Sequence, residues 1–453
     1  MDRFGLYFAA LAAAGGSADG RLRILAQGAA GRSVFLQYDA TSDPDPGSAP
    51  LIRVPAPLVI TAAQASRSDI VSRCALQLDG AATSSGVLLA LLILTERARG
   101  AESQWAWYID ALPRAGSNGL FLSQTDLDAL AGTPVRRAVD AKLRQLQRQY
   151  AACQGVLEHW QRASPGRGPV SFDAFKWATF VVLSRAISLQ SFFESTRSAR
   201  PACYDGDDQA LVPVLDMLNH SSQPNAFWTV DADGSVSVFA DSCSTGPTTD
   251  SVTGSATGSA TGPVTGDGSC NRQLTELHLS YGEKPATEWL YEHGFVPLDN
   301  QHDVWPYFVE MQGSPELVAV KILWFRELGL LPRIMLAAPD SDGHYRLPRA
   351  DLLALCLAEL DDSSDACGRA VGKVCVEAPY FAMDGTLIDD DEKLLALPGL
   401  QTFAVGQCAA RLSDQAAAMR AQSCAAPAAA PAVQAYLRSS AALLDKIADR
   451  MNH

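Results

Sequence analysis

Segments with strand patterns stand on both sides of a long helical block in this chain. GRSVFLQYDA and LIRVPAPLVIT, within residues 31–61, alternate apolar and polar residues around a polar loop, which predicts two short strands. Three helical patterns follow within residues 85–200, in GVLLALLILTERARG, ALAGTPVRRAVDAKLRQLQRQYAACQGVLEHW and FDAFKWATFVVLSRAISL. Beyond them, AFWTVDADGSVSVFA predicts a hairpin that turns at Asp233-Gly234. A mixed α+β fold with a helical insertion is therefore expected.

The rest of the chain, from residue 241 onward, changes character twice. Residues 241–271 are rich in Gly, Ser and Thr and cannot bury a core, which predicts a disordered surface loop. TELHLSYG then predicts a strand that carries Leu277, Leu279 and Tyr281 on one face, and KPATEWLYEHG predicts a short helix. Only helical patterns follow in residues 301–453. We therefore expect domain boundaries that separate the ranges 1–84, 85–200, 201–300 and an all-α C-terminal domain, 301–453.

Composition and charge exclude some classes of function. The chain has 453 residues, of which 47% are hydrophobic and 19% charged, enough for two or three domains with buried cores. Lys+Arg is 36 and Asp+Glu is 50, so the net charge is −14. A general nucleic-acid binder needs a basic surface, whereas an acidic chain suits a basic protein partner. We expect no nucleic-acid ligand.

The cysteines and the apolar runs indicate the compartment in which the protein is expected. The ten cysteines include no CxxC or CxC pair, which argues against a zinc site and favours a reducing compartment, cytoplasm or nucleus. The first residues predict a short helix that stops at Gly15-Gly16, with a signal peptide as the alternative. The apolar run in GVLLALLILTERARG is too short to cross a bilayer, so no membrane partner is expected.

A row of polar residues, Asn219-His220-Ser221-Ser222, follows the apolar run VPVLDML. Taken alone, such a row is either a plain turn or the floor of a ligand site. Together, DMLNHSSQPNA and ELHLSYGEKPATEWLYEHGF resemble the SET-domain methyltransferases, in the branch typified by the Rubisco large-subunit lysine methyltransferase, which acts on non-histone proteins. The motifs that carry the resemblance are Asn219-His220-Ser221, Tyr281-Gly282 and Gly294-Phe295.

Upstream segments extend the resemblance. TERARGAESQWAWYIDALP is similar to a family segment with Ser-x-Trp and Leu-Pro, and FKWATFVVLSRAI is similar to its Trp-Ala…Ser-Arg helix. The chain departs from the family in its first cofactor loop, where Ser33 stands in place of the second glycine of Gly-x-Gly. It also lacks the cysteine triad of many histone-modifying relatives.

The resemblance implies an S-adenosylmethionine-dependent protein-lysine methyltransferase and assigns roles to particular residues. Tyr281 would be the catalytic tyrosine, and Arg185 would pair with the cofactor's carboxylate. The cofactor-binding residues implied in this way are Asn219, His220, Arg185, Gly31, Arg32, Ser33 and Phe295. The partner would be a basic protein with a target lysine, such as a ribosomal protein or translation factor, and the enzyme a monomer.

Two other functions remain open from the sequence. One relative of this fold modifies histidine, so a protein-histidine methyltransferase is an alternative. A catalytically silent SET protein that serves as a protein-binding module is the other. Retention of Asn219, His220, Tyr281 and Arg185 argues against the silent module, and Ser33 argues slightly for it.

Overall fold

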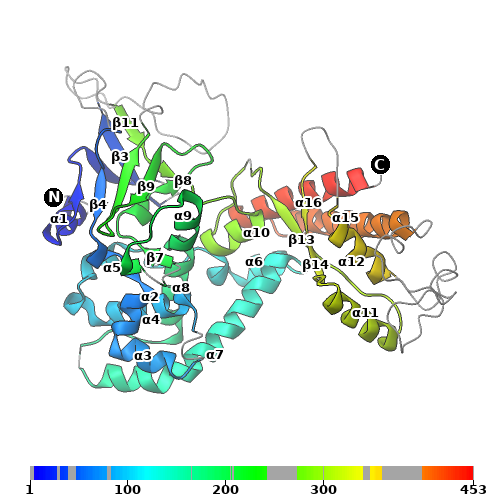
Figure 1. Cartoon of the computed structure of the whole chain (residues 1–453), viewed down its shortest axis with the longest axis horizontal. Coiled ribbons are helices and arrows are strands. Elements are labelled where there is room, and N and C mark those ends of the chain that lie inside the picture. Colours follow the sequence, from blue (N-terminus) through cyan, green and yellow to red (C-terminus); the bar gives the residue numbers. More distant parts are fainter. Residues whose placement is uncertain are drawn as a thin grey trace. The chain divides into compact units, whose positions relative to one another are not determined.

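The computed structural model describes most of the chain in two compact units (Figure 1). The described residues are 5–27, 31–38, 47–78, 83–164, 166–204, 206, 209–241, 273–298, 300–339, 347–359 and 400–451. Residues 1–116 and 142–282 form the first unit, and residues 117–141 and 283–453 form the second. Nearly all of the predicted disordered loop, residues 242–271, lies outside the described residues.

Strands from both sides of the helical block pair directly in the first unit. One sheet has the order β11-β3-β2 and the other the order β1-β4-β10-β9. Thr275 lies opposite Leu36 in the first sheet, and Val238 lies opposite Ile52 in the second. The strands are β1 (Ser17–Ala18), β2 (Leu22–Gln27), β3 (Gly31–Tyr38), β4 (Ile52–Val54), β9 (Ala226–Val230), β10 (Val236–Ala240) and β11 (Gln273–Glu276).

The predicted hairpin is present, with Val230 opposite Val236 around the turn that contains Gly234 at φ 79°. A smaller sheet has the order β5-β7-β6, and β8 pairs with β12 in parallel. These short strands are β5 (Ile60–Thr61), β6 (Ile187–Ser188), β7 (Gln209–Leu211), β8 (Asn219–His220) and β12 (His278–Leu279). The strand predicted over TELHLSYG is thus divided into β11 and β12 at Leu277.

Helices of the first unit pack around α4, which is apolar over most of its surface and buried. Its Leu89, Ile93 and Leu94 have no exposed surface, and α8 packs against it. Ser171 caps α8 by accepting a hydrogen bond from the Ala174 amide. The helices are α1 (Gly5–Ala13), α2 (Ala62–Arg67), α3 (Asp69–Ala75), α4 (Ser85–Arg99), α5 (Ala106–Ala111), α8 (Phe172–Arg185) and α9 (Leu189–Thr196).

The long predicted helix begins later than its pattern does. The structure has α6 (Gln124–Ala129) and then α7 (Pro134–Arg162), and α7 contributes residues to both units. Pro134 occupies the first turn of α7, where a helix needs no amide donor. The 29-residue α7 has a strongly amphipathic pattern, in agreement with the sequence.

The second unit contains the expected C-terminal helices and also a two-stranded sheet that the sequence pattern does not predict. β13 (Val304–Phe308) pairs with β14 (Arg333–Ala337), and their inward residues Trp305, Tyr307, Ile334 and Leu336 are buried. The α-helices described from residue 283 onward are α10 (Ala286–Glu288), α11 (Pro315–Glu327), α12 (Arg349–Glu359), α15 (Leu400–Ala425) and α16 (Pro431–Met451). The α15–α16 pair forms the largest helix contact of this unit.

Gly294 ends the helix predicted over KPATEWLYEHG. After α10 the chain continues as one π-helical turn, Trp289–His293, and Gly294 then adopts φ 81°. A Cβ atom at Gly294 would overlap the Ser117 carbonyl. The glycine is required both by its left-handed backbone and by this close approach.

We expect Gly294→Ala to lower the free energy of unfolding of the second unit by about 3 kcal/mol, because it adds backbone strain to a steric overlap. Gly406→Ala is the matched control, since Gly406 lies in α15 and a Cβ there meets no atom within 4 Å. That control should raise stability by about 1 kcal/mol through helix propensity. Denaturant unfolding followed by circular dichroism measures both, and equal stability of the two variants would contradict the account.

Candidate functional site

Two motifs that are far apart in the sequence meet at the β8–β12 pair. Asn219 lies opposite His278 and His220 lies opposite Leu279, and the Ser221 amide donates to the Leu279 carbonyl at 3.0 Å. This parallel pairing brings the Asn-His motif alongside the strand that leads into Tyr281. A two-residue strand gives no periodic signal, so only the resemblance predicted that the motifs meet.

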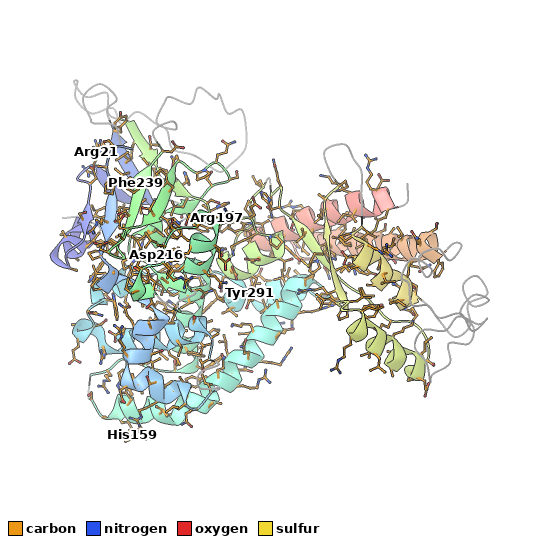
Figure 2. The ribbon with its side chains drawn as sticks, in the orientation of Figure 1. Arg21, His159, Arg197, Asp216, Phe239 and Tyr291 are labelled. Carbon is orange, nitrogen blue, oxygen red and sulfur yellow. The ribbon has the colours of Figure 1, made fainter. Side chains whose placement is uncertain are left out.

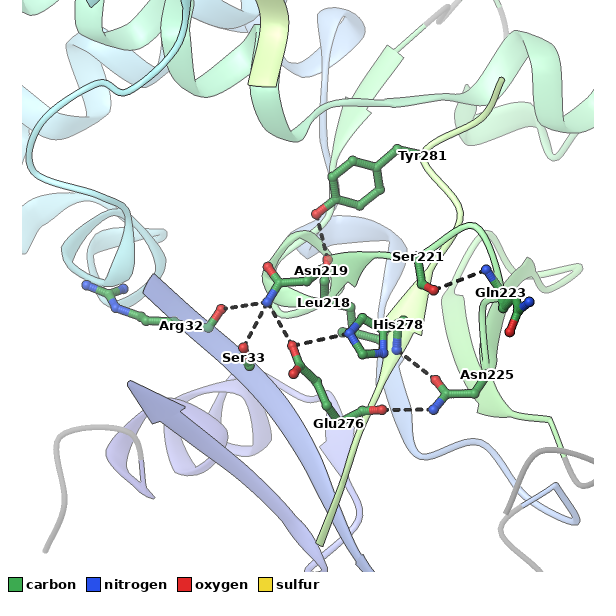
Figure 3. A network of polar contacts seen from close by, with 10 residues as sticks. All are labelled: Arg32, Ser33, Leu218, Asn219, Ser221, Gln223, Asn225, Glu276, His278 and Tyr281. Atoms are coloured by element: carbon green, nitrogen blue, oxygen red, sulfur yellow. Dashed lines mark hydrogen bonds and ion pairs between the residues drawn. The ribbon is translucent and has the colours of Figure 1, made fainter. Parts of the chain in front are cut away.

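Tyr281 is anchored at both its backbone and its hydroxyl, and Figure 3 shows the hydroxyl contact. Its hydroxyl donates to the Leu218 carbonyl at 2.7 Å, and its amide donates to Nδ1 of His220 at 3.2 Å. Burial raises the pKa of Tyr281 to about 12; nearby Arg185 opposes the rise and Asp216 adds to it. The hydroxyl therefore stays protonated at neutral pH and keeps its orientation.

His220 is held in its neutral form. Its ring lies 5.4 Å from the Tyr281 ring, centroid to centroid. Because Nδ1 accepts the Tyr281 amide hydrogen, the ring proton is on Nε2. Burial lowers the pKa of His220; a backbone hydrogen bond at Leu279 opposes this shift, and the charge of His278 adds to it.

The Asn219 amide is the centre of a second set of contacts (Figure 3). Its Nδ2 donates to Ser33 Oγ at 2.8 Å and to Glu276 Oε1 at 2.9 Å, and it lies 3.4 Å from the Arg32 carbonyl. Asn225 in turn binds the backbone next to Glu276. Its Nδ2 donates to the Glu276 carbonyl and its Oδ1 accepts from the His278 amide, each at 2.8 Å.

Asp216, which precedes Leu218 in the chain, forms a buried ion pair with Arg185. Arg185 Nη1 donates to the Asp216 carbonyl at 2.7 Å and lies 3.2 Å from its Oδ2, and the Tyr108 hydroxyl donates to the same Oδ2 at 3.0 Å. Figure 2 marks Asp216 within the first unit, where its side chain has no exposed surface. Burial raises the pKa of Asp216 despite the opposing charge of Arg185.

Backbone strain is located at the start of the same segment. Val214 has φ 74° and ψ −46°, and it precedes the 3₁₀ turn Leu215–Met217 that carries Asp216. A β-branched residue rarely adopts a positive φ, and such strain persists only where the surroundings impose it. The Val214 amide donates to the Tyr7 hydroxyl at 3.2 Å, and both residues are buried.

The structure places six of the predicted residues around these contacts in the first unit. Asn219, His220 and Tyr281 lie on β8 and just after β12, Arg185 ends α8, and Arg32 and Ser33 follow Gly31 at the start of β3. Phe295 belongs to the second unit. Its ring lies 5.2 Å from the Trp289 ring and 6.0 Å from the His293 ring, and 37% of the residue is exposed.

Sequence reasoning missed three side chains of this site: Asp216, Tyr108 and Glu276. Asp216 had a usable signal, because an acidic residue inside the apolar run VPVLDML needs a buried partner. Tyr108 and Glu276 lie in segments that carry the resemblance, but nothing local marks their partners, which are more than 50 residues away in the sequence.

The chemistry of the site is that of binding and orientation. Two buried polar atoms, Arg185 Nε and Asp216 Oδ1, have no hydrogen-bond partner within the described part of the chain. Arg185 thus retains a donor for an anionic group. Across the described ranges, no group of three or more His, Cys, Asp or Glu side chains is placed to hold a metal ion. None of the described helices is both long and apolar enough to cross a membrane.

Sequence comparisons find related methyltransferases. No model of a known protein family matches the chain. SET domain-containing protein 4 of Mus musculus is 27% identical over 228 residues, which cover 49% of this chain and 45% of that protein. An actin-histidine N-methyltransferase of Danio rerio is 25% identical over 219 residues, 48% of this chain and 30% of that protein.

A ribosomal lysine N-methyltransferase of Schizosaccharomyces pombe is 24% identical over 145 residues, 32% of this chain and 24% of that protein. Each match spans less than half the length of these curated relatives.

Solved structures with the same fold cover nearly the whole chain. The SET domain of LSMT bound to lysine and AdoHcy has a TM-score of 0.63 at 14% identity, and covers 99% of this chain and 90% of that chain. Rubisco LSMT bound to AdoMet has the same TM-score at 13% identity, with 100% and 91% covered. The fold predicted from the resemblance is confirmed.

We expect His220 to make stability depend on pH. Burial disfavours the imidazolium, so the unfolded chain binds the proton more readily, and stability falls as pH drops below the ordinary histidine pKa of about 6.5. Unfolding at pH 7.5 and 5.5 should show a smaller loss for His220→Phe than for the wild type. Equal losses in the two proteins would refute the assignment.

Proposed function

We propose that this chain, a SET-domain protein with the fold of the Rubisco large-subunit methyltransferase, transfers a methyl group from S-adenosylmethionine to a lysine of a non-histone protein. The observation that carries the proposal is the placement of Tyr281. A buried, protonated hydroxyl is fixed by a backbone carbonyl, next to the Asn219-His220 pair and under the influence of the Arg185 charge.

The site suits the charged groups of S-adenosylmethionine. Arg185 keeps a buried Nε donor for a carboxylate, although its charge is already matched by Asp216. The Asn219 side chain uses only its nitrogen in the contacts described, so its oxygen remains for an N–H donor. Arg32 and Ser33 offer backbone groups from β3. When bound, S-adenosylmethionine supplies a methyl group on a sulfonium, ready for in-line displacement.

The chain's own residues supply orientation and exclusion of water. Because the Tyr281 hydroxyl donates its proton to the Leu218 carbonyl, its oxygen lone pairs remain for an incoming amine. A lysine amine must lose a proton to react, and a buried environment favours its neutral form. Holding the neutral amine in line reduces the barrier chiefly through proximity and electrostatics. No general base is required on the protein.

Histidine is the second candidate for the methylated residue. Actin-histidine N-methyltransferases are among the relatives, and they support this alternative directly. The ribosomal lysine N-methyltransferase and the LSMT structures support lysine. A silent binding module is the third candidate, and the anchored Tyr281 hydroxyl argues against it. The net charge of −14 supports a basic protein substrate. We place the enzyme, as a monomer, in the cytoplasm or nucleus.

Tyr281→Phe should abolish methyl transfer while preserving the fold. Loss of one oriented hydroxyl lowers kcat about 100-fold or more, and binding of S-adenosylhomocysteine should change by less than about threefold. The measurement is transfer of labelled methyl from S-adenosylmethionine to a protein in a cell lysate, with calorimetry for binding.

Tyr204→Phe is the matched control. Tyr204 is also buried in the first unit, and its hydroxyl donates to the Gly234 carbonyl. It should keep wild-type transfer. A wild-type chain that binds no S-adenosylmethionine would refute the proposal outright.

The pH dependence separates lysine from histidine. With a lysine substrate of pKa near 10.4, kcat/KM should rise about tenfold per pH unit between pH 6.5 and 9. Tyr281, whose pKa is about 12, does not titrate in this range. A histidine substrate, with pKa near 6.5, would give a rate that levels off above about pH 7. Mass spectrometry of the labelled protein identifies the residue, and a plateau with methylhistidine would transfer the assignment to histidine.

A further inference from the structure

The orientation of the Asn219 amide is fixed by chemistry as well as by position. An ionised carboxylate only accepts hydrogen bonds, so the amide group that faces Glu276 has to be the NH₂. If the amide were reversed, two acceptor oxygens would lie about 2.9 Å apart. Within the described residues, all three side-chain contacts of Asn219 are made by Nδ2, which leaves Oδ1 on the other side.

Ser33 reinforces the same orientation. Its side chain is buried on β3, and its hydroxyl oxygen lies 2.8 Å from Nδ2 of Asn219. A glycine at this position would leave that direction of the amide without a side-chain acceptor. Two acceptors, from β3 and β11, therefore match the two hydrogens of the NH₂ group (Figure 3).

Glu276 is itself held in place. It is the last residue of β11, opposite Phe35 of β3, and its carbonyl is bound by Asn225. Its side chain is 16% exposed, and its Oε1 lies 3.5 Å from Nε2 of His278. A carboxylate fixed in this way can hold another side chain at low entropic cost, because it has little rotamer freedom left to lose.

We propose that Glu276 and Ser33 are positioning residues that lock the Asn219 amide with Oδ1 toward the methyl donor, where it accepts an N–H hydrogen bond. The inference rests on the proposed function, since it concerns the same binding site. Neither residue touches the donor through its side chain; each acts through Asn219. Ser33, which stands in place of the family's second glycine, is thus one of the two residues that hold the Asn219 amide.

A double-mutant cycle tests the proposal, with calorimetry of S-adenosylhomocysteine as the readout. Glu276→Ala should weaken binding about tenfold, and Ser33→Ala about threefold. In an Asn219→Ala background, each of these changes should alter affinity by less than about twofold, because the residue through which they act is gone. Glu283→Ala is the matched control. It removes the same charge from an exposed side chain and should leave affinity unchanged.

Glu276→Gln guards against a purely structural effect. It keeps an acceptor oxygen for Asn219 without the charge, and it should restore affinity to within about threefold of the wild type. Unchanged affinity in Glu276→Ala, or the same loss with and without Asn219, would overturn the inference while the proposed function stands. A wild-type chain that binds no S-adenosylhomocysteine would overturn the proposed function, and this inference with it.

Discussion

The parallel pairing of β8 with β12 is the constraint on which the site depends. Two residues on each strand join segments about 60 positions apart, and Tyr281 then closes the junction from both its amide and its hydroxyl. A two-residue ladder contributes little free energy by itself. It holds because β11 is paired with β3 and because Asn225 ties the neighbouring loop to Glu276 and His278. These long-range pairings thus fix the positions of the Asn219, His220 and Tyr281 side chains.

The Arg185–Asp216 pair contributes position rather than stability. Both side chains lose most or all of their hydration, and burial of paired charges often costs as much free energy as their attraction returns. The pair is nevertheless bound to Tyr108 and adjoins the strained Val214. A site that must present a cation and a hydroxyl in fixed places needs such a network, and the stability of the surrounding core sustains it.

Local sequence patterns predicted the elements that are determined by short-range interactions. The hairpin at Asp233-Gly234, the helix α4 and the stop at Gly294 follow from turn chemistry and periodicity. The β13–β14 sheet did not, because its strands are separated by α11 and each is short. Within the site, the resemblance predicted Asn219, His220 and Tyr281. Glu276, which holds Asn219, depends on a tertiary contact that no local pattern encodes. The acidic Asp216 inside the apolar run VPVLDML signals a buried partner, but the local pattern does not identify that partner as Arg185.

The backbone conformation at position 33 explains why a serine can stand where the family has its second glycine. A glycine is needed where φ is positive or where an added Cβ would clash. Ser33 lies in the extended β3, paired with Leu25, and is not among the described residues with positive φ. Its side chain points toward Asn219, where its hydroxyl oxygen accepts a hydrogen bond from the amide nitrogen. At this position the fold requires an extended residue rather than a flexible one, so a serine can occupy it and add an interaction that glycine lacks.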